Sequence, residues 1–336
     1  MKTRKRIRKS NPRAGDVHVN RPLTNWAMMF LQNSENFIAS RAMPNLPVDQ
    51  QSDTYYKWAR EDFLRDEAEE VADGAETKGS GYTLSTSPYL CKVYGWHKMV
   101  TDRQRKNADK IINLDKSAVN FVMSKLAIRR ERQFASTYLG TSIWGTDMTG
   151  VASAPSGSQF IVWSAPTSDP IVDIRTGKRT ILGRTGYEPN KMIIGQEAWD
   201  ALLDNDAILD RITGGAISSQ PAKVQRQLIA SLFEIDQIFV SKAVYNSANK
   251  GATEATGFIN ADICLLYYAP DSIGGYEPTA GTQFSWTGIG GGASEFGVRM
   301  RRLRKEDPEA DKVDGKMAYD YRVTASELGY YFTNCA

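Results

Sequence analysis

The clearest hydrophobic pattern in this chain lies between Trp96 and Leu139, a stretch without glycine or proline. Within it, apolar residues recur at the spacing of one helical face, at Ile112, Val119, Val122, Leu126 and, more loosely, Phe134. The positions opposite them are basic, at Lys116, Lys125, Arg129, Arg130 and Arg132. With Asp109 as N-cap and Gly140 beyond the C-terminus, the pattern predicts one helix over residues 109–139, about 45 Å long.

Ahead of this helix, residues 53–93 are predicted to form a long hairpin with a charged, glycine-rich tip. Its first strand is dense in aromatic residues, at Tyr55, Tyr56, Trp58 and Phe63, and a run of acidic residues follows. The many charges argue against burial, so we expect the hairpin to project. Because an isolated two-stranded ribbon is marginal in water, we expect these aromatic rings to pack on a second surface.

The remaining segments mix strands and helices without a repeat. Residues 140–186, rich in Ser, Thr, Pro and Gly, are predicted to form strands, turns and loops. A buried strand over 187–195 precedes a helix over 196–203. Pro221 is predicted to start another helix, with Val224, Leu228 and Leu232 on one face. Further strands are predicted over 235–245, 263–269 and 298–305, and a closing strand pair over 318–332. The fold class is α+β.

Charge is concentrated at the N-terminus. The chain has 42 basic and 39 acidic residues, a net charge of +3. Seven of the basic residues precede the first acid, Asp16: Lys2, Arg4, Lys5, Arg6, Arg8, Lys9 and Arg13. Without them, 35 basic residues face 39 acids. Such a block suits a polyanion or an acidic partner such as a scaffold, and a plain solvated tail is an equally good interpretation.

A second basic cluster lies on the predicted strand over 298–305, at Arg299, Arg301, Arg302, Arg304 and Lys305. Five cations in seven residues need anionic neighbours, either within the chain or across an interface, and we favour salt bridges over nucleic acid. The acidic residues that follow, Asp307, Glu309, Asp311 and Asp314, do not match the spacing of a calcium-binding loop. They are predicted to form a solvated turn.

Residues that carry chemistry are sparse. The chain has two histidines, His18 and His97, and neither has partners at metal-ligand spacing. No Gly-x-Ser-x-Gly or phosphate-loop motif occurs. Three widely spaced cysteines are expected to be buried and reduced. Because no apolar run approaches 20 residues, no membrane partner is expected. We therefore expect no catalytic residue, no cofactor and no metal, and a protein that is not an enzyme.

The order of these parts is specific: a basic arm, a projecting hairpin, a long helix, a strand–helix module and late strands. It resembles the major capsid proteins of tailed bacteriophages, which share the Hong Kong 97 fold. Local stretches are also similar to that family, at residues 189–212 (PNKMIIGQEAWDALLDNDAILDRI), 281–288 (GTQFSWTG), 296–307 (FGVRMRRLRKED) and 327–336 (ELGYYFTNCA).

The resemblance implies a division of the chain. Residues 1–47 would form an N-terminal arm and 48–92 an extended loop. Residues 93–185 would form a peripheral domain with its spine helix over 109–139, 186–245 an axial domain, and 246–336 a return to the peripheral domain. The aromatic residues of the extended loop would then contact a neighbouring subunit.

The resemblance also implies a structural function. The chain would self-assemble into hexamers and pentamers of an icosahedral phage head that encloses double-stranded DNA. Its partners would be further copies of itself, packaged DNA without sequence preference, a separate scaffolding protein, a portal and decoration proteins. Its location would be the virion, and the host cytoplasm during assembly. The alternative function is the shell of a cargo-storing nanocompartment with the same fold. A basic nucleic-acid-binding protein is a weaker alternative, since the arm has no aromatic residue among its cations.

Overall fold

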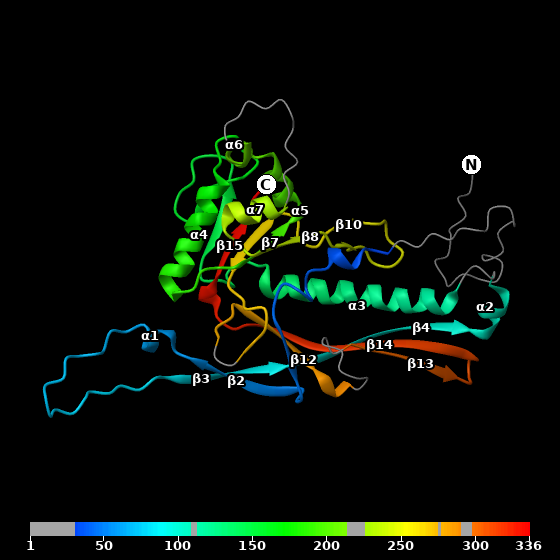
Figure 1. Cartoon of the computed structure of the whole chain (residues 1–336). Helices are drawn as coiled ribbons and strands as arrows, with labels where there is room; N and C mark the ends of the chain where they lie inside the picture. The colour runs from blue at the N-terminus through cyan, green and yellow to red at the C-terminus, as the bar shows by residue number, and fades with distance from the viewer. Residues whose placement is uncertain (1–30, 109–112, 214–225, 275–276, 290–297) are drawn as a thin grey trace.

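The computed structural model describes residues 31–108, 113–213, 226–274, 277–289 and 298–336. A five-stranded sheet runs along one long helix, a six-stranded sheet lies near the C-terminal end of that helix, and a hairpin projects from one side (Figure 1). Helices and strands are mixed along the chain, as the α+β class predicted. Within the described residues, no helix is long and apolar enough to span a bilayer.

The first sheet is five-stranded and built around a long strand, β14 (Ala310–Val323). Along one edge β14 pairs with β4. Along its other edge it pairs directly with β13 over its first part and with β12 over its last part, and all three pairings are antiparallel. β1 adds a parallel strand to β12. The other strands of this sheet are β1 (Asn45–Val48), β4 (Lys92–Thr101), β12 (Gly281–Trp286) and β13 (Val298–Lys305). The predicted basic strand over 298–305 is thereby confirmed.

The long helix is α3 (Leu114–Tyr138), which lies across this sheet (Figure 1). It is 25 residues long and is capped by Asn113, whose side chain accepts a hydrogen bond from the Lys116 backbone N–H. The predicted start at Asp109 was therefore wrong, and Asp109 itself lies outside the described residues. A short helix, α2 (Asp102–Asn107), follows β4 and leads toward α3. A capping box at Thr101 stabilises its N-terminus.

The buried face of α3 differs in part from the predicted one. Val122, Leu126 and Phe134 are buried as expected, but Val119 is exposed. The core positions that the pattern missed are Ala118, Glu131 and Tyr138. Arg130 also departs from the predicted basic face, because it donates hydrogen bonds to the Tyr321 hydroxyl and the Gln283 side-chain carbonyl. A one-position error on a helix rotates a side chain by about 100°, which is enough to exchange core for solvent.

The second sheet is six-stranded, in the order β6-β5-β15-β11-β7-β8. Its central strands β7 and β11 are almost wholly buried, because α-helices cover the sheet. The strands are β5 (Asp147–Val151), β6 (Gln159–Ile161), β7 (Lys191–Gly195), β8 (Gln237–Ser241), β11 (Ile263–Tyr267) and β15 (Gly329–Thr333). The helices are α4 (Pro170–Thr185), α5 (Gln196–Asp204), α6 (Asp206–Thr213) and α7 (Arg226–Phe233).

Three sequence expectations fail in this part of the fold. Residues 140–186, predicted as strands, turns and loops, contain the 16-residue helix α4, which starts at Pro170 behind an Asp169 cap. Of the helix predicted to start at Pro221, Pro221 and Val224 lie outside the described residues. Leu232 packs against the core as expected, but Leu228 is 47% exposed, and α7 buries Ile229 and Phe233 instead. The strands over 318–332 do not pair with one another, since β14 and β15 belong to different sheets.

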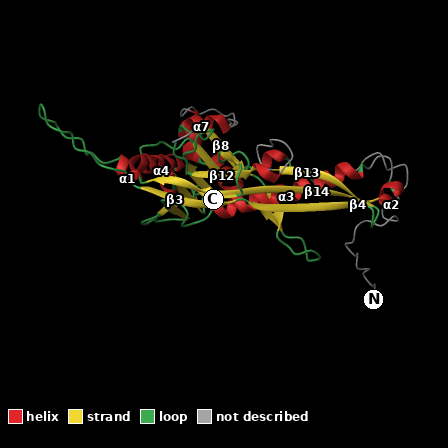
Figure 2. Cartoon of the chain, turned by 90° about the horizontal axis from the view of Figure 1, so that it is seen from below, coloured by secondary structure: helices red, strands yellow, loops and turns green. Residues whose placement is uncertain are grey.

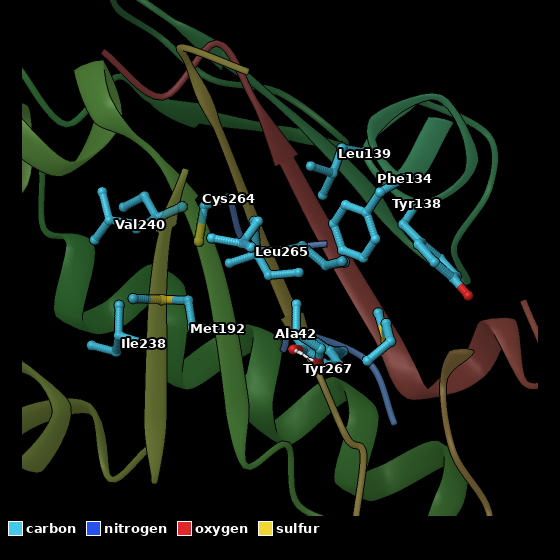
Figure 3. Close-up of a cluster of buried hydrophobic side chains, with 14 of the residues drawn as sticks. Ala42, Phe134, Tyr138, Leu139, Met192, Ile238, Val240, Cys264, Leu265 and Tyr267 are labelled. Carbon is cyan, nitrogen blue, oxygen red and sulfur yellow. Dashed lines mark hydrogen bonds between the residues drawn. The ribbon is translucent and has the colours of Figure 1, made fainter. Parts of the chain in front are cut away.

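One continuous core joins the two sheets. Met192, Val240 and Leu265 from the six-stranded sheet lie in the same cluster as Phe134 and Tyr138 from the end of α3 (Figure 3). The chain just before β1 passes through this core, with Ile38, Ala39, Ala42 and Met43 all buried. The Tyr267 hydroxyl donates to the Ala42 carbonyl at 2.5 Å, which fixes this segment at the centre of the molecule.

The predicted hairpin is present as a two-stranded sheet of β2 (Ser52–Trp58) and β3 (Leu84–Leu90), in register from Ser52↔Leu90 to Trp58↔Leu84. A single-turn helix, α1 (Arg60–Phe63), begins the long tip. The tip extends away from the rest of the molecule in both views (Figures 1 and 2). A second small ribbon, β9 (Val244–Asn246) with β10 (Thr256–Phe258), lies near α3.

Candidate assembly surfaces

The base of the hairpin is held by its own chain. Tyr89 of β3 stacks on Phe284 of β12 with ring centroids 4.5 Å apart, and Tyr55 of β2 lies 5.4 Å from the same ring. Together with Cys91 and Ala318, they form a separate small hydrophobic cluster. Tyr55, predicted to contact another subunit, is therefore half-buried within its own chain.

The other three predicted aromatic residues are exposed. Tyr56 and Phe63 are each 62% exposed and Trp58 is 40% exposed. Phe63 stacks on Tyr82 across the hairpin, with centroids 5.9 Å apart, but Tyr82 is itself 65% exposed. Large aromatic rings left in solvent on a projecting ribbon are characteristic of a surface that binds another protein.

Beyond these rings the tip is acidic. Residues 60–78 contain eight carboxylates against three cations. Asp62 organises the base of the tip by accepting a hydrogen bond from the Thr83 backbone N–H at 2.7 Å, and that bond lowers its pKa. Every residue from Leu64 to Thr83 is exposed, including the apolar side chains of Leu64 and Val71. The tip thus presents negative charge with apolar residues interspersed.

The basic strand β13 divides its cations between the two faces of the sheet, because side chains alternate along a strand. Arg302 and Arg304 point to the α3 side. Arg304 contacts Asp102 at 2.6 Å, and Arg302 contacts Asp311 and also Asp115 of α3, the latter at 3.4 Å. Arg105 of α2 completes this cluster at 2.8 Å from Asp115 and 2.9 Å from Asp311. Three cations therefore face three carboxylates.

The positive and negative charges of this cluster balance one another. The Arg302 guanidinium beside Asp311 holds the pKa of that carboxyl below its usual range, and Arg304 does the same for Asp102. The salt bridges predicted for Arg302 and Arg304 therefore lie within one chain. The predicted solvated turn was wrong for Asp311 and Asp314, which are buried residues of β14. Sequence spacing could not show the whole cluster, because Arg105 lies 206 residues from Asp311 and Asp102 lies 202 residues from Arg304.

The opposite face of β13 is less well matched. Arg301 lies 3.6 Å from Asp314, which it shares with Lys312 at 3.5 Å. Arg299 pairs in register with Lys316, a like charge, and donates to the Ile289 carbonyl at 2.8 Å. For Lys305, predicted to form a salt bridge, the described residues provide none.

A buried carboxylate that the sequence did not single out anchors the arm segment. Glu131 of α3 is fully buried, and its two oxygens accept hydrogen bonds from the backbone N–H groups of Ile38 (3.2 Å) and Ala39 (2.9 Å). Burial raises the pKa of Glu131 to about 7. One signal was available: Glu131 is the only acid after Asp115 in a helix rich in Lys and Arg.

The seven N-terminal cations from Lys2 to Arg13, and His18, lie outside the described residues. His97 is exposed on β4. The three cysteines are free and buried as predicted, and burial raises the pKa of each thiol. In the part of the chain that the structure describes, no group of three His, Cys, Asp or Glu side chains is placed to hold a metal ion.

Comparison with known proteins finds sequence similarity to phage capsid proteins. A family model described as phage major capsid protein E matches residues 161–275. The major capsid protein of Burkholderia phage BcepMu is 25% identical over 264 residues, covering 77% of this chain and 80% of that protein. The sequence relatives are thus capsid proteins of phages.

Solved structures share the fold. The capsid structure of Cyanophage P-SCSP1u matches with a TM-score of 0.62 at 10% identity, over 97% of this chain and 96% of that chain. The holo-SrpI encapsulin complex from Synechococcus elongatus matches with a TM-score of 0.55 at 12% identity, over 94% and 93% of the two chains. The resemblance to phage major capsid proteins, predicted from the order of the segments, is confirmed.

Proposed function

We propose that this chain, similar in sequence and fold to phage major capsid proteins, is the structural subunit of an icosahedral phage head. It self-assembles into hexamers and pentamers that enclose double-stranded DNA. The observation that carries the proposal is the combination of a capsid fold over nearly the whole chain with a projecting hairpin whose aromatic rings lie in solvent. Such rings supply most of the binding energy in protein interfaces.

The proposed roles of the segments follow the Hong Kong 97 arrangement. Residues 48–92 act as the extended loop that reaches a neighbouring subunit, through Tyr56, Trp58 and Phe63. The five-stranded sheet with α3 serves as the peripheral domain, and residues 186–245 belong to the axial domain around which subunits meet. Strands that precede residue 186 and strands that follow residue 245 share the six-stranded sheet with strands of the axial segment. The axial and peripheral domains would therefore move as one packed body.

Assembly of the purified chain tests this proposal. We expect particles of uniform diameter and megadalton mass in negative-stain microscopy and light scattering, with a scaffolding protein supplied where the subunit alone does not close. A stable monomer at high protein concentration, with scaffold present, would contradict the proposal. A separate scaffolding protein, a portal and decoration proteins are the further partners proposed, and the virion, with the host cytoplasm during assembly, is the proposed location.

The alternative is a cargo-storing nanocompartment, which the likeness to the encapsulin structure supports. The content of native particles distinguishes the two. A phage head contains nuclease-protected DNA of uniform length, whereas a nanocompartment contains a protein cargo. The sequence relatives favour the phage head.

We propose that the N-terminal cations contact phosphates or an acidic scaffold without sequence preference. Binding of duplex DNA should then weaken with salt by a log–log slope of about −0.9 per neutralised phosphate. Deletion of residues 1–13 should flatten that slope in a fluorescence anisotropy titration and leave the circular dichroism spectrum unchanged. An unchanged slope would show that the phosphate contacts, if any, lie elsewhere.

A further inference from the structure

We propose that the exposed side of α3 binds the phosphates of duplex DNA through three cations, Lys125, Arg129 and Arg132. This inference rests on the proposed function, because it names the surface that the subunit would turn toward the enclosed DNA. The three residues are spaced at i, i+4 and i+7, which places them along one side of the helix. All three are exposed. We call them the cationic line.

The carboxylates of α3 do not neutralise the cationic line. Asp115 contacts Arg105 at 2.8 Å and Arg302 at 3.4 Å, so its charge is already matched elsewhere. Glu131 is fully buried, and both of its oxygens accept hydrogen bonds from backbone N–H groups. Among the described residues, no salt bridge joins any member of the cationic line to an acid. The line therefore has positive charge that an external anion can match.

Aromatic rings hold the two arginines of the line in place. The Arg129 guanidinium lies 5.0 Å from the ring centroid of Tyr94 on β4, and the Arg132 guanidinium lies 4.7 Å from that of Tyr245 on β9. The β9–β10 ribbon that supplies Tyr245 lies alongside α3 (Figure 1). A guanidinium stacked on a ring keeps N–H groups at its edge, where a phosphate can bind bidentately. Because the rings restrict both side chains beforehand, less conformational entropy is lost on binding.

The surroundings of the line favour phosphate over a protein partner. The centre of a protein interface is typically apolar and depleted of lysine. Here the nearest exposed ring on the helix, Phe121, lies beneath the Lys125 ammonium, 5.6 Å from it. A pocket between α3 and β4 opens beside Lys125, and a second lysine, Lys98, lines it. None of the described residues that line this pocket is acidic. The chemistry on offer is that of a polyanion site.

The length of the line suits a duplex. Lys125 and Arg132 are seven residues apart, which is about 10.5 Å along a helix axis. Duplex DNA carries one negative charge per about 1.7 Å of its axis, so this length offers about six phosphates to three cations. Each cation can therefore reach a phosphate whatever the sequence, and no contact with a base is required.

The sheet face turned away from α3 also has three exposed cations, Arg301, Lys305 and Lys316. Lys316 faces away from the helix because its neighbour Gly315 faces toward it, and a Cβ on Gly315 would collide with side chains of α3. On this face, Arg301 has an acid of its own chain, Asp314, at 3.6 Å. The two sets of cations have equal charge and exposure but lie on opposite sides of the sheet, so one serves as the control for the other.

The salt dependence of DNA binding tests the assignment. The variant Lys125→Gln, Arg129→Gln, Arg132→Gln removes the cationic line from the full chain. Fluorescence anisotropy with a labelled duplex measures the log–log slope of affinity against salt. We expect the slope to become shallower by about 2.7, which is about 0.9 for each of three phosphates. A rise from 50 to 200 mM salt would then cost the original chain about 40-fold more affinity than the variant.

The matched control is Arg301→Gln, Lys305→Gln, Lys316→Gln, which removes the same charge from the opposite face. It should keep the original slope to within about 0.5, and the N-terminal cations, present in both variants, cancel from the comparison. Circular dichroism melting verifies the folding of each variant. If the first variant melts at a lower temperature, Lys125→Gln alone, at one end of the line, should still reduce the slope by about 0.9.

Several results would overturn the assignment: no binding of the unaltered chain to duplex DNA, an unchanged slope in the first variant, or an equal loss in the control. Loss of polyglutamate binding with DNA binding intact would instead show that the line contacts an acidic protein. Sedimentation velocity should find particles in both variants, and their loss in the first variant alone would place the line in a subunit interface. Failure of the unaltered chain to form particles contradicts the proposed function, and the DNA titration of the subunit still decides whether the line binds phosphates.

Discussion

Helix α3 buries Val122, Leu126 and Phe134 against its own chain, whereas the hairpin leaves Tyr56 and Phe63 mostly in solvent. Both segments contain several large apolar residues. The helix finishes its packing within the subunit, because β14 crosses beneath it and Gly315 allows close approach. In the hairpin, only Tyr55 and Tyr89 at the base pack on another described element of the chain, at Phe284. The rest of the hairpin has only its own two strands to pack against. Apolar patterning thus indicates that a surface will be covered, but not by which molecule.

The comparison predicts that changes near α3 act on folding and changes in the hairpin act on assembly. Leu126→Ala should have the largest effect on the free energy of unfolding, a loss of about 2–5 kcal/mol, because it leaves a cavity between α3 and β14. Lys125→Ala, one residue away and exposed, should change it by less than about 0.5 kcal/mol. Urea unfolding of the isolated subunit measures both. Similar values for the two variants would show that the buried face of α3 is assigned incorrectly.

The second prediction concerns Glu131, whose folded-state pKa of about 7 lies above its usual value of 4.5. An acid with a raised pKa binds its proton more tightly in the folded chain than in the unfolded one. Subunit stability should therefore be highest below about pH 4.5 with respect to this group, and should fall by up to about 3 kcal/mol as pH rises to 7 and above.

Glu131→Gln is the matched variant, because it cannot ionise. It should remove this part of the pH dependence in unfolding measured between pH 5 and 8, although its amide group can accept only one of the two backbone hydrogen bonds. The same slope in both proteins would show that Glu131 does not titrate in that range. Increased proteolysis of residues 31–44 in the variant would report a loosened arm segment.

The smallest effect on folding is expected in the hairpin. Trp58→Ala with Phe63→Ala removes two exposed rings, so the subunit should stay soluble and melt cooperatively within a few degrees of the original. Assembly should fail, because aromatic interface anchors typically contribute about 2 kcal/mol or more each. Circular dichroism and sedimentation velocity on the same sample measure the two properties. Loss of folding would place these rings in the subunit core, and normal particles would make them incidental.

The sequence by itself determined the elements whose signal is local. The hairpin, the helix α5 after β7 and the basic strand β13 were all predicted near their observed bounds. Each is specified by a contiguous pattern: glycines around a charged tip, a switch from buried strand to amphipathic helix, and a run of cations. The order of these elements was enough to predict the resemblance to phage capsid proteins. Helix α4 was missed because its glycines and threonines are poor helix formers, and its burial on β11 and β15 overrides that propensity.

Only the tertiary structure decided which charges and apolar faces are satisfied within the chain. Arg304 meets Asp102, and Arg105 meets Asp311, across more than 200 residues of sequence, so these ion pairs could not be read from spacing. The same packing left Lys316 and Arg299 as cross-strand neighbours on the sheet face turned away from α3. The two-residue period of a strand determines that successive cations of β13 point to opposite faces of the sheet. Which of those faces is covered by α3 is decided only by the tertiary structure. Long-range packing sets the local charge balance, and a single sequence has no local signal for a contact made by residues 200 positions away.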